Sequence, residues 1–116
     1  MPTTIGFGKL ERTLLSADRL PHSVQIARIL FKQQIRSRAP GLTRFKNAQN
    51  VLPAAAKGQL YYEFPVGWAT APTPEFPTPA GSHRLVALVD ARDNVLKMYY
   101  TRSHYAAQEW WELQYP

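Results

Sequence analysis

The hydrophobic pattern of residues 24–38 predicts the main helix of the chain. Apolar side chains recur there at steps of three and four residues, which is the period of a helix with one buried stripe. The stripe comprises Val24, Ile26, Ala27, Leu30, Phe31 and Ile35. Pro21 breaks the chain before this helix, Ser23 can cap it, and Pro40-Gly41 ends it. A shorter helix is expected over residues 9–17, and residues 1–8 are expected to be loose.

The second half of the chain has the pattern of strands. Residues 60–66, 83–89, 95–101 and 109–114 are rich in aromatic and β-branched side chains. The short polar stretch 90–94 predicts an antiparallel hairpin between two of these strands. Residues 42–58 are expected to be loop with short extended pieces. Residues 67–81 contain four prolines and predict a long, stiff loop inside one domain, because strands lie on both sides of it.

Helices followed by antiparallel strands predict a single α+β domain over residues 1–116. We expect helical structure within residues 9–38, packed on an antiparallel sheet of about four strands within residues 59–114. Successive side chains of a strand point to opposite faces of the sheet. If Tyr62, Phe64 and Val66 face the helix, Glu63 therefore faces the open side.

Composition narrows the classes of function. The chain has 116 residues, of which 45% are hydrophobic, and this argues against global disorder. It has no cysteine, so disulfides, thiolate nucleophiles and cysteine-based zinc sites are excluded. The three histidines lack the spacing of metal ligands, and we expect no metal or other cofactor. No apolar run is long enough to span a membrane, and the first residues lack the pattern of a signal peptide.

The net charge of +6 suits a polyanionic partner such as nucleic acid, because basic side chains that neutralise phosphates release counterions. The same charge is compatible with a basic domain that binds no nucleic acid. Charge alone leaves both interpretations open.

Three polar residues stand in or next to the predicted strands, namely Glu63, Arg84 and His104. A carboxylate, a guanidinium and an imidazole are the groups needed to cleave RNA without a metal. One removes the 2′-hydroxyl proton, one holds the phosphate charge, and one protonates the leaving oxygen. Each also has a structural interpretation, as an exposed strand carboxylate, an arginine in a surface ion pair and a structural histidine. His83, beside Arg84, is interpreted as a surface residue.

Four segments together resemble the small microbial guanyl-specific ribonucleases, the fungal and bacterial family that includes barnase. Residues 45–53 (Phe-Lys-Asn-Ala-Gln-Asn-Val-Leu-Pro) are similar to the guanine-binding loop of that family. The other three segments are 61–66 (Tyr-Tyr-Glu-Phe-Pro-Val), 81–86 (Gly-Ser-His-Arg-Leu-Val) and 99–106 (Tyr-Tyr-Thr-Arg-Ser-His-Tyr-Ala). Their order agrees with the family, and the resemblance extends over about residues 45–113.

The resemblance implies a metal-independent endoribonuclease that cleaves single-stranded RNA through a 2′,3′-cyclic phosphate. It implies that Glu63 is the general base, Arg84 the phosphate-binding arginine and His104 the general acid. Substrate-binding positions of the family fall on Lys46, Asn47, Gln49 and Tyr105. The implied partners are RNA and an acidic, barstar-like inhibitor or immunity protein, and we expect a monomer without a membrane association.

The chain departs from the family pattern at several positions. Gln49 replaces the usual glutamate, and its amide offers one acceptor and one donor where a carboxylate offers two acceptors. Guanine preference is therefore expected to be relaxed or altered. Ala48 and Ala80 stand where bacterial members often have arginine, and Lys46 or Arg102 could substitute for them in phosphate binding. The loop 67–81 is longer than the family norm, and we favour surface decoration over a role in shielding the cleft or binding a partner.

The cellular context has two candidates, a secreted enzyme and a toxin domain of a larger bacterial effector. The missing signal peptide and the end of the domain at the chain terminus favour the toxin domain. Two alternatives to an enzyme are also open. One is a catalytically inactive, basic RNA-binding module with the same fold, and the other is a structural protein in which the three polar residues form ion pairs.

Overall fold

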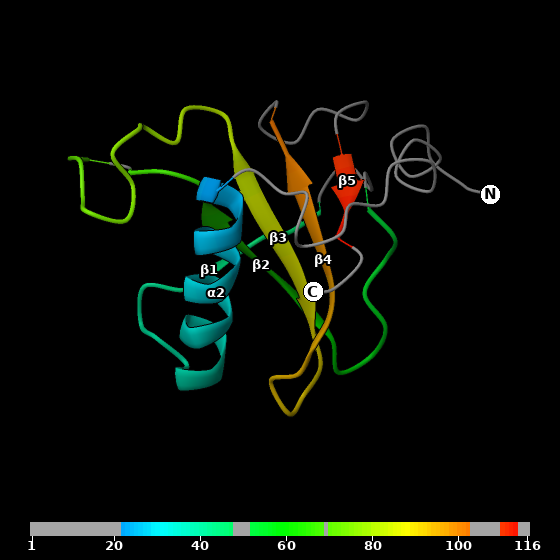
Figure 1. Cartoon of the computed structure of the whole chain (residues 1–116). Coiled ribbons are helices and arrows are strands. Elements are labelled where there is room, and N and C mark those ends of the chain that lie inside the picture. Colours follow the sequence, from blue (N-terminus) through cyan, green and yellow to red (C-terminus); the bar gives the residue numbers. More distant parts are fainter. Residues whose placement is uncertain (1–21, 48–51, 69, 103–109, 114–116) are drawn as a thin grey trace.

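The computed structural model describes residues 22–47, 52–68, 70–102 and 110–113 (Figure 1). Within them the elements are α2 (His22–Ser37), β1 (Thr43–Arg44), β2 (Leu60–Pro65), β3 (Arg84–Val89), β4 (Val95–Thr101) and β5 (Trp110–Glu112). The strands form one antiparallel sheet in the order β1-β2-β3-β4-β5, with α2 packed on it. The predicted α+β class is therefore confirmed. The helix predicted over 9–17 and the loose residues 1–8 lie outside the described residues, as do residues 109 and 114.

The helix α2 buries one face of the sheet. Its buried side chains are Val24, Ala27, Phe31 and Ile35, which are spaced by three or four residues as the sequence pattern predicts. Phe31 stacks on Phe64 of β2, with ring centroids 5.2 Å apart and an interplanar angle of 14°. Phe64 and Val66 belong to this main core and Tyr62 packs against it, so the predicted orientation of β2 is confirmed. Ser23 lies inside the helix and is not its cap, because α2 begins at His22.

The connection between β3 and β4 is the hairpin that the sequence predicts. The Asp90 N–H donates to the Asn94 carbonyl oxygen at 3.0 Å, and Asp90 Oδ1 accepts from the backbone N–H groups of Arg92 and Asn94. The hydrogen bonds from the Asn94 backbone and side chain lower the pKa of the Asp90 carboxyl. Asp93 adopts a positive φ of 64°, a turn conformation that aspartate tolerates. One aspartate side chain thus organises this turn.

The sheet is larger than predicted, with five described strands instead of about four, and it starts at residue 43 instead of 59. The additional strand is β1, which pairs Thr43 with Glu63 and Arg44 with Tyr62. A strand of two residues is too short to produce a periodic pattern in the sequence. Only the pairing partner on β2 reveals it.

The face of the sheet opposite α2 carries a second, smaller core. It consists of Leu52, Tyr61, Val86, Tyr99 and Trp110, with Phe45 and Leu88 packed against it. Burial raises the pKa of the Tyr61 phenol to about 12 and also raises that of Tyr99. Both side chains are therefore neutral at physiological pH. This cluster lies on the face opposite α2, whereas α2 covers the other face with the main core.

The proline-rich loop 67–81 folds back on itself at its base. The Trp68 N–H donates to the Thr78 carbonyl at 3.1 Å, and the Ala80 N–H donates to the Trp68 carbonyl at 3.0 Å. Phe76, near the tip, returns into the main core and is only 8% exposed. The expectation of simple surface decoration is therefore wrong, because the loop contributes a side chain to the core. Prolines keep its backbone stiff, but the hydrogen bonds and Phe76 determine its path.

We expect Gly67→Ala to destabilise the fold by about 2 kcal/mol or more. Gly67 has a φ of 137°, and a Cβ at this position would lie 2.6 Å from the Ala80 N and Cα atoms. The two limbs of the loop could then no longer approach each other. Gly41→Ala is the control, because a Cβ there meets nothing within 4 Å. Urea unfolding of both variants measures the difference, and equal stabilities would contradict the proposed close packing.

Candidate active site

Glu63 and Arg84 lie on the same face of the sheet, opposite α2. In the observed register Glu63 pairs with Val86, and Arg84 pairs with Pro65 on β2. Arg84 is therefore the diagonal neighbour of Glu63 on the adjacent strand, and such neighbours are separated by roughly 7–8 Å. Both side chains are half-buried. A carboxylate and a guanidinium thus lie on adjacent strands of one sheet face.

The guanidinium of Arg84 is held by the turn that precedes β3. Its Nη1 donates to the carbonyl oxygens of Gly81 and His83, both at 2.8 Å. The turn is closed by the His83 N–H, which donates to the Ala80 carbonyl at 2.9 Å, and Gly81 supplies a positive φ of 55°. Both backbone acceptors bind Nη1, and these two hydrogen bonds fix the orientation of the guanidinium. Such an oriented guanidinium is suited to bidentate contact with an anion.

The loop that resembles a guanine-binding loop is closed by the side chain of Asn47. Its Nδ2 donates to the Leu52 carbonyl at 2.8 Å, and its Oδ1 accepts from the Leu52 N–H at 3.1 Å. Asn47 has a φ of 51°, which asparagine adopts more readily than most residues. Leu52 is in turn buried in the small core on the face of Glu63. The amide of Asn47 is therefore used to shape the loop, and the loop is fixed to the same face as Glu63.

Lys46 is exposed beside this loop. It lines a pocket of about 190 Å³ together with Arg44, Phe45, Asn47 and Tyr61, among others. Phe45 and Tyr61 connect this pocket to the small core, and their rings meet edge-on with centroids 6.1 Å apart. The pocket therefore combines two cations with an aromatic wall, which is a suitable surface for a nucleotide.

Three of the predicted site residues, Gln49, His104 and Tyr105, lie outside the described residues. The positions that precede them are described. Asn47 precedes Gln49 by two residues, and Thr101 precedes His104 by three. Thr101 is fully buried and is the cross-strand partner of Arg84. The segment with His104 thus follows a residue paired with Arg84.

Two neighbouring residues differ from the sequence-based expectations. Arg102 lies over the Trp111 ring, 4.6 Å from its centroid, and Trp111 packs against the main core. It therefore belongs to the helix side of the sheet and is poorly placed to support Arg84 on the opposite face. His83 is not a simple surface residue, because it is half-buried and its Nδ1 lies 2.7 Å from the Tyr100 hydroxyl. Because side chains alternate along a strand, the position of Arg84 on the open face could have predicted that His83 points toward the helix side.

The described residues contain no group of three or more histidine, aspartate or glutamate side chains arranged to hold a metal ion. No helix among them is long and apolar enough to cross a membrane.

Comparison with known proteins assigns the chain to a family. A family model described as ribonuclease matches residues 8–109. The chain belongs to this ribonuclease family. Among solved structures, the ribonuclease is similar to ribonuclease Sa2 with guanosine-2′-cyclophosphate, with a TM-score of 0.51 and 22% sequence identity. The similarity covers 88% of this chain and 95% of ribonuclease Sa2, and at this identity it shows a common fold. No curated protein sequence matches the chain.

Membership in this family implies that the substrate of the protein is RNA. The family match and the fold together support an endoribonuclease. Glu63 and Arg84 are the two predicted catalytic residues that the structure describes, and they share one face and two adjacent strands.

Proposed function

We propose that this ribonuclease is a metal-independent endonuclease that cleaves single-stranded RNA to a 2′,3′-cyclic phosphate. The observation that carries the proposal is the diagonal placement of Glu63 and Arg84 on β2 and β3. A base and an anion-binding group must act on neighbouring atoms of one nucleotide, namely the 2′-oxygen and the phosphate. The placement of both residues on paired strands of one sheet supports this arrangement.

In the first step the Glu63 carboxylate accepts the 2′-hydroxyl proton, and the 2′-oxygen forms a bond to phosphorus. The bond from phosphorus to the 5′-oxygen breaks, and His104 donates a proton to that leaving oxygen. Arg84 stabilises the negative charge that develops on the non-bridging oxygens. A second step, in which water opens the cyclic phosphate, reverses the two proton transfers. The requirement for a 2′-hydroxyl restricts the reaction to RNA.

The remaining candidate residues have binding roles in this proposal. Lys46 is an exposed cation beside the loop and is suited to a phosphate contact. Asn47 acts through the shape of the loop, since both ends of its amide are bonded to Leu52. Gln49 and Tyr105 contact the base and the phosphate, respectively, by analogy with the family pattern.

We expect the purified chain to cleave a dinucleotide RNA substrate in the presence of EDTA and to release a product with a 2′,3′-cyclic phosphate. Glu63→Ala and His104→Ala should each lower kcat by about two to four orders of magnitude, because each removes a positioned base or acid. Glu112→Ala is the matched control. Glu112 occupies the same cross-strand row as Glu63, through Tyr99 and Val86, but its carboxylate is bonded to Lys97 at 2.9 Å. The Glu112→Ala variant should have a kcat within a few-fold of the wild-type value.

Three results would contradict the proposal. Activity that disappears in EDTA would contradict a metal-independent reaction. A loss of activity in Glu63→Ala that is accompanied by unfolding, as measured by circular dichroism, would contradict a chemical role for Glu63. RNA that binds in a gel-shift assay but stays intact would instead support an inactive RNA-binding module.

We expect Gln49→Glu to raise the preference for guanine. A carboxylate can accept two hydrogen bonds from the Watson–Crick edge of guanine, whereas the Gln49 amide can accept at one atom only. Cleavage of a panel of dinucleotides with each base on the 5′ side measures kcat/KM for each base. The ratio for guanine over the other bases should rise by about tenfold or more, the usual value of a matched hydrogen-bond pair to a base. An unchanged ratio would show that residue 49 does not determine the base preference.

We further propose that the enzyme acts outside its own producing cell, as a secreted enzyme or a toxin domain, and that an acidic inhibitor protects the producer. The basis is the net charge of +6, which an acidic protein complements, and the RNA substrate, which every cell contains. Expression in a bacterial cytosol should arrest growth, and Glu63→Ala should relieve the arrest. Normal growth with active enzyme accumulated in the cytosol would remove the reason for an inhibitor.

A further inference from the structure

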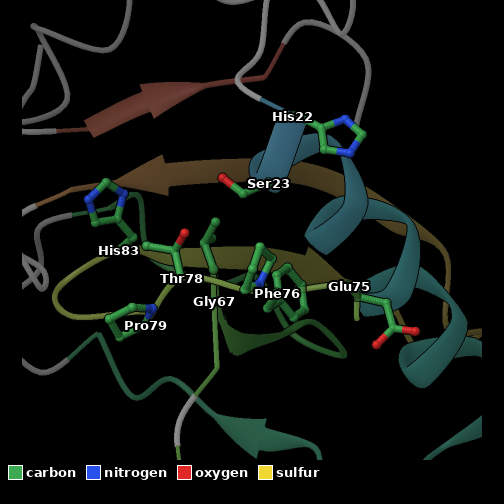
Figure 2. Close-up of a pocket in the computed structure, with 10 residues that line it drawn as sticks. His22, Ser23, Gly67, Glu75, Phe76, Thr78, Pro79 and His83 are labelled. Atoms are coloured by element: carbon green, nitrogen blue, oxygen red, sulfur yellow. The ribbon is translucent and has the colours of Figure 1, made fainter. Parts of the chain in front are cut away.

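A pocket of about 350 Å³ lies between the start of α2 and the proline-rich loop (Figure 2). Val66 and Phe76 contribute its apolar wall, and both belong to the main core. Its polar lining consists of His22, Ser23, Thr78 and His83 together with Glu75. Figure 2 shows Ser23, Thr78 and His83 around a common space, whereas the Glu75 carboxylate points away from them. Pockets of this size commonly hold small ligands or single side groups of larger ones.

The pocket is connected to the candidate active site through a single turn. His83 and Arg84 are consecutive, and consecutive residues at a strand start point to opposite faces of the sheet. His83 therefore lines the pocket on the helix side, while Arg84 lies on the side of Glu63. The same turn holds the Arg84 guanidinium through the Gly81 and His83 carbonyls. A strand of RNA with one phosphate at Arg84 can thus reach the pocket by crossing this end of the sheet.

The walls of the pocket are fixed before any ligand binds. The hydrogen bonds between Trp68 and Thr78 and between Ala80 and Trp68 hold the loop closed at its base. The Tyr100 hydroxyl lies 2.7 Å from His83 Nδ1 and fixes the imidazole, and burial raises the pKa of Tyr100, which keeps its hydroxyl protonated. A preformed pocket costs little ordering entropy when a ligand binds.

The lining combines an apolar wall with imidazole and hydroxyl groups, and this combination suits a nucleobase. Its flat faces pack on aromatic and apolar groups, and its edge exchanges hydrogen bonds with polar side chains. We propose that this pocket binds the base of a nucleotide that lies beyond the two nucleotides joined by the cleaved bond. The proposal rests on the proposed ribonuclease function and deepens it, because it defines a substrate of more than two nucleotides.

The test compares kcat/KM for a dinucleotide with that for the same dinucleotide extended by two nucleotides at either end. Thr78→Tyr fills the pocket from its exposed rim, and Thr70→Tyr is the matched control in the same loop, exposed and outside the lining. In the wild type, one of the extensions should raise kcat/KM by about fivefold or more, the usual effect of one stacked base. Thr78→Tyr should abolish that gain and leave dinucleotide cleavage unchanged, whereas Thr70→Tyr should retain both values.

Failure of this proposal is distinguishable from failure of the ribonuclease function. The subsite is overturned, and the ribonuclease function stands, if the dinucleotide is cleaved but neither extension raises kcat/KM. The same conclusion follows if Thr78→Tyr lowers kcat/KM equally for the dinucleotide and the extended substrate. If no substrate is cleaved, a titration with the extended dinucleotide tests whether the pocket binds RNA. The NMR signals of the His22 and His83 rings are the readout. Shifts of both rings that disappear in Thr78→Tyr and persist in Thr70→Tyr support the pocket. Unchanged rings overturn it.

Discussion

The packing of Phe31 on Phe64 determines which face of the sheet carries Glu63 and Arg84. Phe64 can contact α2 only if the even-numbered side chains of β2 face the helix, and Glu63 must then face the other side. Because β2 pairs with β3 in the observed register, Arg84 lies on the same face as Glu63. A slip of β2 by one residue would turn Glu63 toward the main core, where burying a charge is costly. Burial of one face thus places the polar residues on the other.

The two faces of the sheet are used differently. The helix side holds the main core, whereas the opposite side holds a smaller cluster together with Glu63 and Arg84. Tyr61, Tyr99 and Trp110 give that side rigidity, and Leu52 fixes one end of the predicted base-binding loop to it. Rigid supports of this kind matter for catalysis, because acid, base and phosphate ligand must keep their positions within a fraction of an ångström.

The turn formed by residues 80–84 links the two sides. Its carbonyl groups orient the Arg84 guanidinium, and its histidine lines the pocket beside α2. The proline-rich loop ends in this turn, and its tip is fixed in the main core by Phe76. A single extended RNA strand that contacts Arg84 and the pocket would therefore be bound by one continuous, preformed segment. On this view the long loop enlarges the substrate-binding surface.

Much of the candidate site could be predicted from the sequence. The period of α2, the alternation of β2, the hairpin at Asp90 and the four motifs are local patterns, and they indicated the fold class, the family and the face of Glu63. Other features depend on residues far apart in the chain. The pairing of Thr43 with Glu63, the course of the loop through Trp68 and Phe76, and the position of Arg102 over Trp111 have no local signal.

The amino-acid sequence by itself therefore determined which residues are candidates for the chemistry, because side-chain type and spacing along a strand are encoded locally. Only the tertiary structure decided which of these residues meet. It brought Glu63 beside Arg84, used the Asn47 amide to close its own loop, and turned His83 toward a pocket on the other side of the sheet. The physical reason is that strand register and core packing are fixed by contacts between distant residues, and these contacts have no counterpart in the local pattern.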